Sequence, residues 1–223
     1  MNGVRVGVYY APAPSDPLWA AGAAWLGRDA ELAAAVAQPN LDGIGEFTAD
    51  PRGYGFHATL KPPMRLATSF QGFMADVERL ARRLKPFTLP GLHVTELTGF
   101  LALTQRYPSP DLQNLADMCV ADLDRHRAPP DEAELERRRR AQLSPLQDSM
   151  LVQWGYPYVF DTWFFHMTLT RRLSESEAVR LQPLAERHFA PSLARVRRVD
   201  SLAVFTQAGP GAPFLVAERV PFG

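Results

Sequence analysis

Residues 56–60 read Phe-His-Ala-Thr-Leu, and residues 165–169 read Phe-His-Met-Thr-Leu, so the chain carries two near-copies of one pentapeptide. Each copy places a histidine and a threonine two positions apart in an otherwise apolar run. In a β-strand, residues two apart point to the same face, so each histidine would lie beside its threonine while the apolar neighbours face the core. The copies match at four of five positions and lie 109 residues apart, which indicates a duplicated fold.

The repetition bears on whether the two histidines share one pocket. A single His-x-Thr triplet is a weak signal, and two unrelated strands with half-exposed histidines are the alternative. Two copies in equivalent surroundings instead favour one site that contains His57, Thr59, His166 and Thr168. An imidazole titrates at about pH 6.5, so one histidine can be neutral while its partner is protonated. The pair can therefore supply a general base and a general acid for cleavage of a phosphate ester.

Cleavage of a cyclic phosphodiester needs a base for the attacking water and an acid for the departing sugar oxygen, on opposite sides of phosphorus. The two histidines suit these roles, and which of them is the base stays open because a duplicated site is nearly symmetric. Thr59 and Thr168 would donate hydrogen bonds to the phosphoryl oxygens. This scheme requires no metal and no cofactor, and it predicts a bell-shaped pH profile.

The paired His-x-Thr motifs resemble those of the two-histidine (2H) phosphoesterases, a superfamily that includes bacterial RNA-ligase-like proteins and cyclic nucleotide phosphodiesterases. Residues 54–63 (YGFHATLKPP), 165–170 (FHMTLT) and 25–29 (WLGRD) are most similar to an uncharacterised branch encoded in bacterial phosphonate-degradation operons. The resemblance extends over nearly the whole chain. It implies the RNA-ligase-like fold and a phosphoesterase reaction, with phosphonate metabolism as the context.

The predicted elements follow the same order twice. In the first half we expect strands and helices at 4–10, 17–26, the first motif, 70–84, 92–97 and 99–105. In the second half they are the second motif, a helix opened by a Ser174–Glu177 capping box, and strands at 196–207 and 214–220. Pro183 is expected to kink or shorten that helix. This order predicts an α+β fold of two pseudo-symmetric lobes, each a small, mainly antiparallel sheet backed by helices, with the active-site groove between them.

The domain organisation that we expect is one bilobal domain over 1–223. The lobe-forming halves are about 1–106 and 159–223, and a helical insertion of about 107–158 separates them. Within the insertion, helices are predicted at 111–127 and 131–143. The arginine run at 137–140 follows acidic residues on the same helix, which favours a solvated face, whereas a phosphate contact, a lid or a dimer contact are the alternatives.

The composition of the chain limits the kinds of ligand and the cellular compartment that we expect. The chain has 223 residues, 46% of them hydrophobic, which is enough for a substantial core. With 24 basic and 24 acidic side chains it has no net charge to grip duplex DNA, while a small phosphate or an RNA end fits. Cys119 is the single cysteine, so no internal disulfide can form. We predict no signal peptide, and no apolar run reaches the roughly 20 residues of a membrane helix. These features predict a cytoplasmic protein that does not enter a membrane. The oligomeric state stays open.

Strand alternation extends the site. Lys61 would share a face with His57 and Thr59 and serve as counter-ion to the phosphate, although a solvent-exposed lysine at a strand end is an equal alternative. Thr170 and Arg172 would share the face of His166 if that strand stays regular. Nearby aromatic rings would stack on a nucleobase or fill the core. The preferred stacking residues are Tyr9 and Phe164; the other candidates are Tyr54, Tyr156, Tyr158 and Trp163.

Three functions are consistent with these residues. The leading one is a metal-independent phosphoesterase that cleaves a small cyclic phosphate of ribose or a nucleotide. The second is a non-catalytic binder of an RNA end or a phosphorylated small molecule. The third is a metallohydrolase, which we disfavour because the motifs lack the spacing of a three-ligand zinc site.

Overall fold

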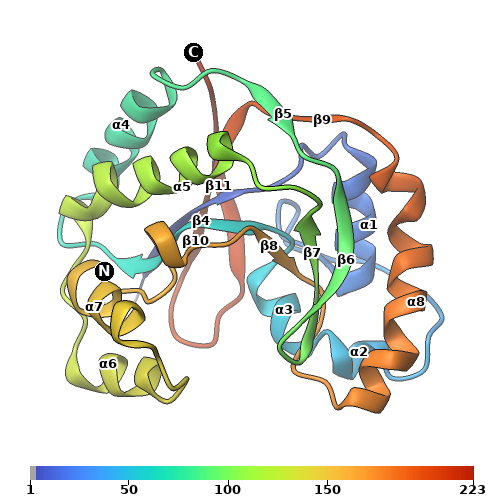
Figure 1. Cartoon of the computed structure of the whole chain (residues 1–223). Helices are drawn as coiled ribbons and strands as arrows, with labels where there is room; N and C mark the ends of the chain where they lie inside the picture. Colours follow the sequence, from blue (N-terminus) through green and yellow to red (C-terminus); the bar gives the residue numbers. More distant parts are fainter. Residues whose placement is uncertain (1–3) are drawn as a thin grey trace.

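The computed structural model describes residues 4–223, and its centre is a seven-stranded sheet in which neighbouring strands are antiparallel (Figure 1). The strands, in order across the sheet, are β11 (Phe214–Pro221), β10 (Ser201–Gln207), β1 (Arg5–Tyr10), β4 (Ala58–Arg65), β8 (His166–Thr168), β7 (Phe100–Gln105) and β6 (Leu92–Leu97). Two short ladders lie outside this sheet. They pair β2 (Arg28–Asp29) with β3 (Ala34–Ala35), and β5 (Phe87–Leu89) with β9 (Arg197–Val199). The predicted α+β class is confirmed.

The sheet has two parts, which meet where β4 pairs with β8 through a single residue pair, Ala58 with Met167. One part contains β11, β10, β1 and β4, and the other contains β8, β7 and β6. β10 and β11 follow β8 in the sequence, yet they extend the part that holds β1. β6 and β7 precede β8, yet they pair on its side. Each part of the sheet therefore takes strands from both halves of the sequence.

Helices pack on the sheet in two pairs. The described helices are α1 (Pro17–Leu26), α2 (Ile44–Phe47), α3 (Ala49–Tyr54), α4 (Phe70–Ala81), α5 (Pro110–Leu123), α6 (Glu132–Arg139), α7 (Pro145–Trp154) and α8 (Glu175–Leu193). α4 and α5 lie together beside β4 and β11, whereas α1 and α8 lie at the opposite side of the molecule (Figure 1). In residues 4–223, no helix combines the length and the apolar character needed to cross a membrane.

One apolar core fills the space between the sheet and these two helix pairs. Strands contribute alternate residues to it, such as Val6 and Val8 of β1 and Leu101 and Leu103 of β7. α5, which lies in the expected insertion, packs on β4 and α4 and so belongs to this layer. Because side chains alternate along a strand, the intervening residues of β1, β4, β8 and β7 face away from this core.

Capping residues account for helix boundaries that the sequence predicts. The Asp16 side chain accepts a hydrogen bond from the first turn of α1, and Ser174 forms the expected capping box before α8. Of the two effects expected of Pro183, a kink or a shortened helix, the shortening is wrong, since α8 continues over 19 residues. Pro183 lies on the exposed side of α8, as does Val179, whose carbonyl would accept from residue 183 in a regular helix.

The segment 107–158 is more helical than the sequence suggests. The helix expected at 111–127 is observed as α5 followed by a 3₁₀ turn, η1 (Asp124–His126), and the second expected helix is the shorter α6. α7 is an additional helix. Ser144 caps it and Pro145 takes its first position, where a proline is favoured because its missing N–H would have no helical partner. A second 3₁₀ turn, η2 (Phe160–Thr162), leads to β8.

Candidate active site

The two His-x-Thr motifs lie side by side at the centre of the sheet. Their middle residues, Ala58 and Met167, are the pair that joins β4 to β8, and both are buried in the core. In an antiparallel pair, the residues on either side of this contact point to the opposite face. Each histidine therefore lies opposite the threonine of the other motif, on the face away from the core.

All four motif side chains line one pocket with a volume of about 290 Å³. The lining residues are Tyr9, Tyr54, Gly55, His57, Thr59, Pro63, Tyr156, His166, Thr168 and Phe214. They come from both parts of the sheet, from the loop that follows α3, and from the segment between α7 and β8. The structure thus brings His57 and His166 together, as the repeated pentapeptides predict.

Both imidazoles are held in the same way. Nδ1 of His57 lies 3.1 Å from the carbonyl of Gly55, and Nδ1 of His166 lies 3.2 Å from the carbonyl of Phe164. A carbonyl accepts, so each Nδ1 carries the proton as donor, and each Nε2 is left with its lone pair for acid–base chemistry. An aromatic ring contacts each imidazole, Tyr9 on His57 at 4.0 Å and Phe164 on His166 at 4.6 Å between ring centroids.

Burial sets the protonation of the pair. The pKa of His57 is lowered to about 4, chiefly by desolvation and also by the nearby His166, against hydrogen bonds to the Gly55 and Tyr54 backbone that raise it. Burial also lowers the pKa of His166. Both imidazoles are then neutral at pH 7 before substrate binds, and a bound phosphate would raise their pKa values because an anion favours the protonated form.

The loop that carries His57 depends on Gly55. Its φ of 80° lies in the left-handed region, and a Cβ there would approach the Ala30 Cβ to 2.9 Å. Arg28 supports the same loop: its guanidinium donates to the carbonyls of Arg52 at 2.7 Å and Gly53 at 3.3 Å. The same Arg28 also donates to the carbonyl of the pocket residue Phe214 at 2.9 Å. Arg28 thus ties the His57 loop to the pocket wall.

For the phosphate-ester cleavage that the sequence predicts, we expect Arg28→Ala to lower kcat about 10- to 100-fold with a smaller effect on KM. The substitution leaves carbonyls of the His57 loop without their charged donor, and small displacements of a catalytic group have effects of this size. Steady-state kinetics would measure the kcat and KM split, and NMR titration would follow the pKa of His57. Arg28→Lys, which keeps the charge but has one donor nitrogen in place of three, should restore part of kcat. An unchanged kcat in Arg28→Ala would contradict the positioning role.

Two tryptophans reinforce the narrow junction between β4 and β8. Trp163 Nε1 donates to the Thr59 carbonyl at 2.8 Å, and Trp25 Nε1 donates to the Leu169 carbonyl at 3.0 Å. Each indole therefore comes from one half of the sequence and bonds the backbone of the motif in the other half. These bonds hold the motifs together where the ladder itself contributes one residue pair.

Lys61 does not reach the pocket, and the prediction that it neutralises the phosphate is wrong. Thr59 pairs with Tyr9 of β1, but Lys61 pairs with Val8, so β4 holds one extra residue at this point. Such a bulge reverses the alternation, and the Lys61 side chain turns to the face covered by helices. The sequence argument assumed a regular strand, which β4 is not.

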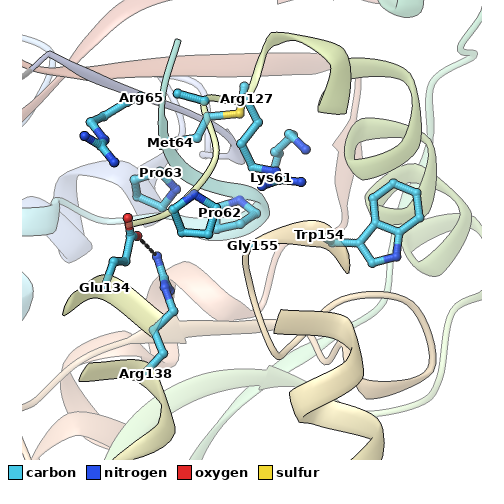
Figure 2. Close-up of a pocket in the computed structure, with 12 residues that line it drawn as sticks. Lys61, Pro62, Pro63, Met64, Arg65, Arg127, Glu134, Arg138, Trp154 and Gly155 are labelled. Atoms are coloured by element: carbon cyan, nitrogen blue, oxygen red, sulfur yellow. Dashed lines mark hydrogen bonds and ion pairs between the residues drawn. The ribbon is translucent and has the colours of Figure 1, made fainter. Parts of the chain in front are cut away.

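The buried Lys61 has structural partners instead. Its Nζ donates to Asp124 Oδ1 at 2.9 Å and to the Val120 carbonyl at 3.1 Å, and 1% of its side chain is exposed. Asp124 also accepts from Arg127 at 2.8 Å. Burial lowers the pKa of Lys61, and the Asp124 charge opposes that effect. Figure 2 shows Lys61 and Arg127 beside the bend of β4, around a small cavity that is separate from the pocket of His57 and His166, with Pro63 in the wall of both.

Two further predicted contacts are also absent from the pocket. The regular strand β8 ends at Thr168, so the alternation does not continue to Thr170 or Arg172. Thr170 is buried, and its Oγ1 accepts a hydrogen bond from Leu101 N at 2.9 Å. Arg172 Nη1 donates to the Thr98 carbonyl at 2.8 Å in the turn between β6 and β7. Both residues support neighbouring backbone and not a ligand.

The aromatic candidates divide between the wall and its surroundings. Tyr9, Tyr54 and Tyr156 line the pocket, whereas the half-exposed Phe164 covers His166 from outside the lining set. That Tyr9 and Phe164 contact the substrate stays a prediction. Phe214 was missed, because a phenylalanine at the start of the last strand carries no sequence signal that distinguishes it from a core residue.

In residues 4–223, no three His, Cys, Asp or Glu side chains are grouped closely enough to hold a metal ion. The hydroxyls of Thr59 and Thr168 make no hydrogen bond to another described side chain or backbone atom, and so they are available to a ligand. The pocket thus offers two neutral imidazoles and two hydroxyl donors in a small, largely aromatic enclosure. That donor set suits a phosphate ester.

The chain is similar to two curated proteins named "Ribose 1,5-bisphosphate phosphokinase PhnN". One, from Janthinobacterium sp. (strain Marseille), is 40% identical over 98% of this chain and 51% of its own length. The other, from Laribacter hongkongensis (strain HLHK9), is 36% identical over 97% of this chain and 52% of its own length. The chain therefore spans about half the length of these relatives. Their names agree with the resemblance to a phosphonate-operon branch.

Among solved structures, the fold is similar to that of E. coli LigT complexed with 3′-AMP, with a TM-score of 0.49 and 15% identity over 99% of both chains. The family model described as "Protein of unknown function (DUF1045)" matches residues 59–215, most of the chain, from the threonine of the first motif to the first residues of β11. The chain belongs to this DUF1045 family.

Proposed function

We propose that the chain is a metal-independent phosphoesterase that cleaves a small cyclic phosphodiester of a ribose or nucleotide by general acid–base catalysis. The observation that carries this proposal is the shared pocket of His57 and His166, each with Nδ1 bonded to a carbonyl and Nε2 available. Two equivalent imidazoles on adjacent strands suit a reaction in which one proton is removed while another is delivered.

The mechanism assigns one histidine to each side of phosphorus. His57, whose pKa burial lowers to about 4, is neutral over most of the pH range and takes the proton of the attacking water. The water oxygen forms the new bond to phosphorus, the ring P–O bond breaks, and protonated His166 gives its proton to the departing sugar oxygen. Thr59 and Thr168 donate hydrogen bonds to the non-bridging oxygens, where charge is held in the transition state.

The size of the pocket and the relatives' names support a small ribose phosphate as substrate. Tyr156, from the segment between the sequence halves, forms part of the pocket wall and restricts the room for a long RNA. The relatives' printed name refers to a ribose that carries two phosphates. A ribose cyclic phosphate within phosphonate metabolism in the cytoplasm is therefore the substrate class that we favour.

The test is turnover of a panel of nucleoside 2′,3′-cyclic phosphates and ribosyl cyclic phosphates, followed by phosphorus NMR. We expect at least one member to be opened to a phosphomonoester, at a rate that EDTA does not change. Loss of activity with EDTA and recovery with added Zn²⁺ or Mn²⁺ would indicate a metallohydrolase. Binding of panel members without turnover would instead support the alternative, a non-catalytic binder of an RNA end or a phosphorylated small molecule.

A further inference from the structure

A strip of β1 leads away from the catalytic histidines. Arg5, Gly7 and Tyr9 share the face of β1 that looks away from the core. A Cβ at Gly7 would lie 2.4 Å from the Tyr9 hydroxyl, so the tyrosine side chain lies back along the strand over Gly7. Its ring contacts His57, and its hydroxyl lies at Gly7, between Tyr9 and Arg5 along the strip. The strip thus connects a catalytic imidazole to a guanidinium.

Arg5 lacks an acidic partner in the described part of the chain. Its Nε donates to the neutral amide oxygen of Gln207 at 2.7 Å, and its Cζ lies 5.5 Å from the ring centroid of Phe214, a pocket residue. Within residues 4–223, Nη1 and Nη2 of Arg5 have no hydrogen bond and no carboxylate within 4.0 Å. Burial lowers the pKa of Arg5, which means that the structure holds a partly desolvated cation without a counter-ion.

A second cation, Arg138 of α6, lies behind the pocket wall and lines the small cavity around Lys61. Arg138 lies over the ring of Tyr156, with Cζ 5.0 Å from the centroid. Its Nη2 donates to Glu134 at 2.8 Å, as Figure 2 shows, but its Nε is buried without a partner. Arg137 lies 3.9 Å from the same Glu134, so one carboxylate serves two arginines. The sequence predicts that the arginines of this helix are solvated, but Arg138 is half-buried while Arg137, Arg139 and Arg140 are exposed.

Arg5 lies near the charges of α6, because its facing residue on β4, Arg65, lines one cavity with Glu134 and Arg138. Glu134 raises the pKa of Arg5, while Arg137 and Arg138 lower it. Arg65, directly opposite Arg5 on β4, adds a further positive charge, with Asp131 at 3.3 Å as its acidic partner. Like charges on facing positions of two strands repel. An anion bound between Arg5 and α6 would relieve this repulsion.

We propose that Arg5 and Arg138 form an anion subsite for a second, non-reacting phosphate monoester of the substrate. The inference rests on the proposed phosphoesterase function, in which the reacting phosphate lies at the histidine pair. A strand rises about 3.3 Å per residue, so the Cα atoms of Arg5 and Tyr9 are about 13 Å apart. This span is long enough for one sugar that carries two phosphates, with the reacting phosphate at the histidines and the second phosphate at Arg5. The substrate class is a cyclic phosphodiester that also carries a terminal phosphate.

The experiment compares substrates that differ by one phosphate. Adenosine 2′,3′-cyclic phosphate is paired with its 5′-phosphorylated form, and ribose 1,2-cyclic phosphate with its 5-phosphorylated form. We expect the wild type to prefer the phosphorylated member of a pair by at least 10-fold in kcat/KM. Arg5→Gln should reduce that preference about 10- to 100-fold, mainly through KM, as expected for the loss of a charged hydrogen bond. Arg138→Gln should reduce it in the same direction.

Arg140→Gln is the matched control, because Arg140 is exposed at the end of α6 and its loss removes the same charge. Its preference should equal that of the wild type. If Arg5→Gln fails to fold, Arg5→Lys replaces it and should retain part of the preference. Equal kcat/KM values for both members of each pair, or an equal effect of Arg5→Gln and Arg140→Gln, would overturn the subsite while leaving the proposed function in place.

A binding measurement separates failure of the subsite from failure of the proposed function. Ribose 5-phosphate, which holds no cyclic ester, is titrated into each variant by calorimetry. We expect binding to the wild type that is at least 10-fold weaker in Arg5→Gln. If no cyclic phosphate is turned over and this binding still depends on Arg5, the proposed reaction is wrong and the anion subsite stands. Absence of both turnover and binding would overturn both.

Discussion

Replacing His57 or His166 by alanine is expected to lower kcat for the best cyclic phosphate about 10²- to 10⁴-fold in each case. Each substitution removes either the proton acceptor or the proton donor of the proposed reaction, and general acid–base groups contribute about this much. The double variant should lose less than the product of the two effects, because the pair acts as a unit. Steady-state assays would measure the losses, and circular dichroism would check the fold.

The pH profile provides a second measurement on the same variants. The rising limb of kcat/KM should lie near pH 4, where His57 becomes protonated and can no longer act as base. The falling limb should lie below pH 6.5, because burial lowers the pKa of His166, which must be protonated to act as acid. His57→Ala should abolish the rising limb. His93→Ala is the control, because His93 lies outside the pocket. Equal losses of kcat in the His57, His166 and His93 variants would contradict the assignment of His57 and His166 as base and acid.

Replacing Lys61 by methionine is expected to destabilise the protein by about 3–5 kcal/mol, because breaking a buried ion pair leaves the partner charge uncompensated. Asp124 would keep Arg127 but lose the buried ammonium at 2.9 Å. For a chain of this size, such a loss lowers Tm by about 10 °C. Calorimetry or thermal denaturation followed by circular dichroism would measure it. The kcat/KM of the folded variant should equal that of the wild type.

Lys85→Met is the matched control, since Lys85 is exposed in the segment between α4 and β5 and has no ion pair in the described residues. Its Tm should stay within about 2 °C of the wild type. The difference in Tm between the two variants tests whether Lys61 stabilises the fold through its buried ion pair. A Lys61→Met variant that keeps its Tm but loses affinity for cyclic phosphates would restore the phosphate-binding role that the structure removes.

The central strands show why part of the site could be predicted. His57 and Thr59 flank one buried residue, and His166 and Thr168 flank another, so a period of two is sufficient to put each pair on one face. The copies of this pattern, 109 residues apart, pointed to a shared pocket, and both motifs line the same cavity. Short-range alternation and repetition are encoded in the order of residues, and no long-range contact is needed to recognise them.

Lys61 and Arg138 show where that reasoning ends. The same alternation put Lys61 in the pocket, but the extra residue in β4 against β1 reverses it. Arg138 was expected on a solvated helix face, yet α6 packs so that its guanidinium covers Tyr156. A bulge depends on the partner strand, and the direction of an arginine depends on the packing of its helix. Neither partner can be identified from neighbouring residues in the sequence.

By itself, the sequence determined the paired His-x-Thr motifs, the strands that carry them and the α+β class, because alternation and capping act over a few residues. Tertiary structure alone decided that β10 pairs with β1 and that Lys61 is buried against Asp124. It also decided that Tyr156 and Phe214 complete the pocket and that Arg28 bonds the Phe214 carbonyl. These features come from contacts between residues distant in the chain. Their energies depend on strand order and register, which are set only when the whole sheet assembles.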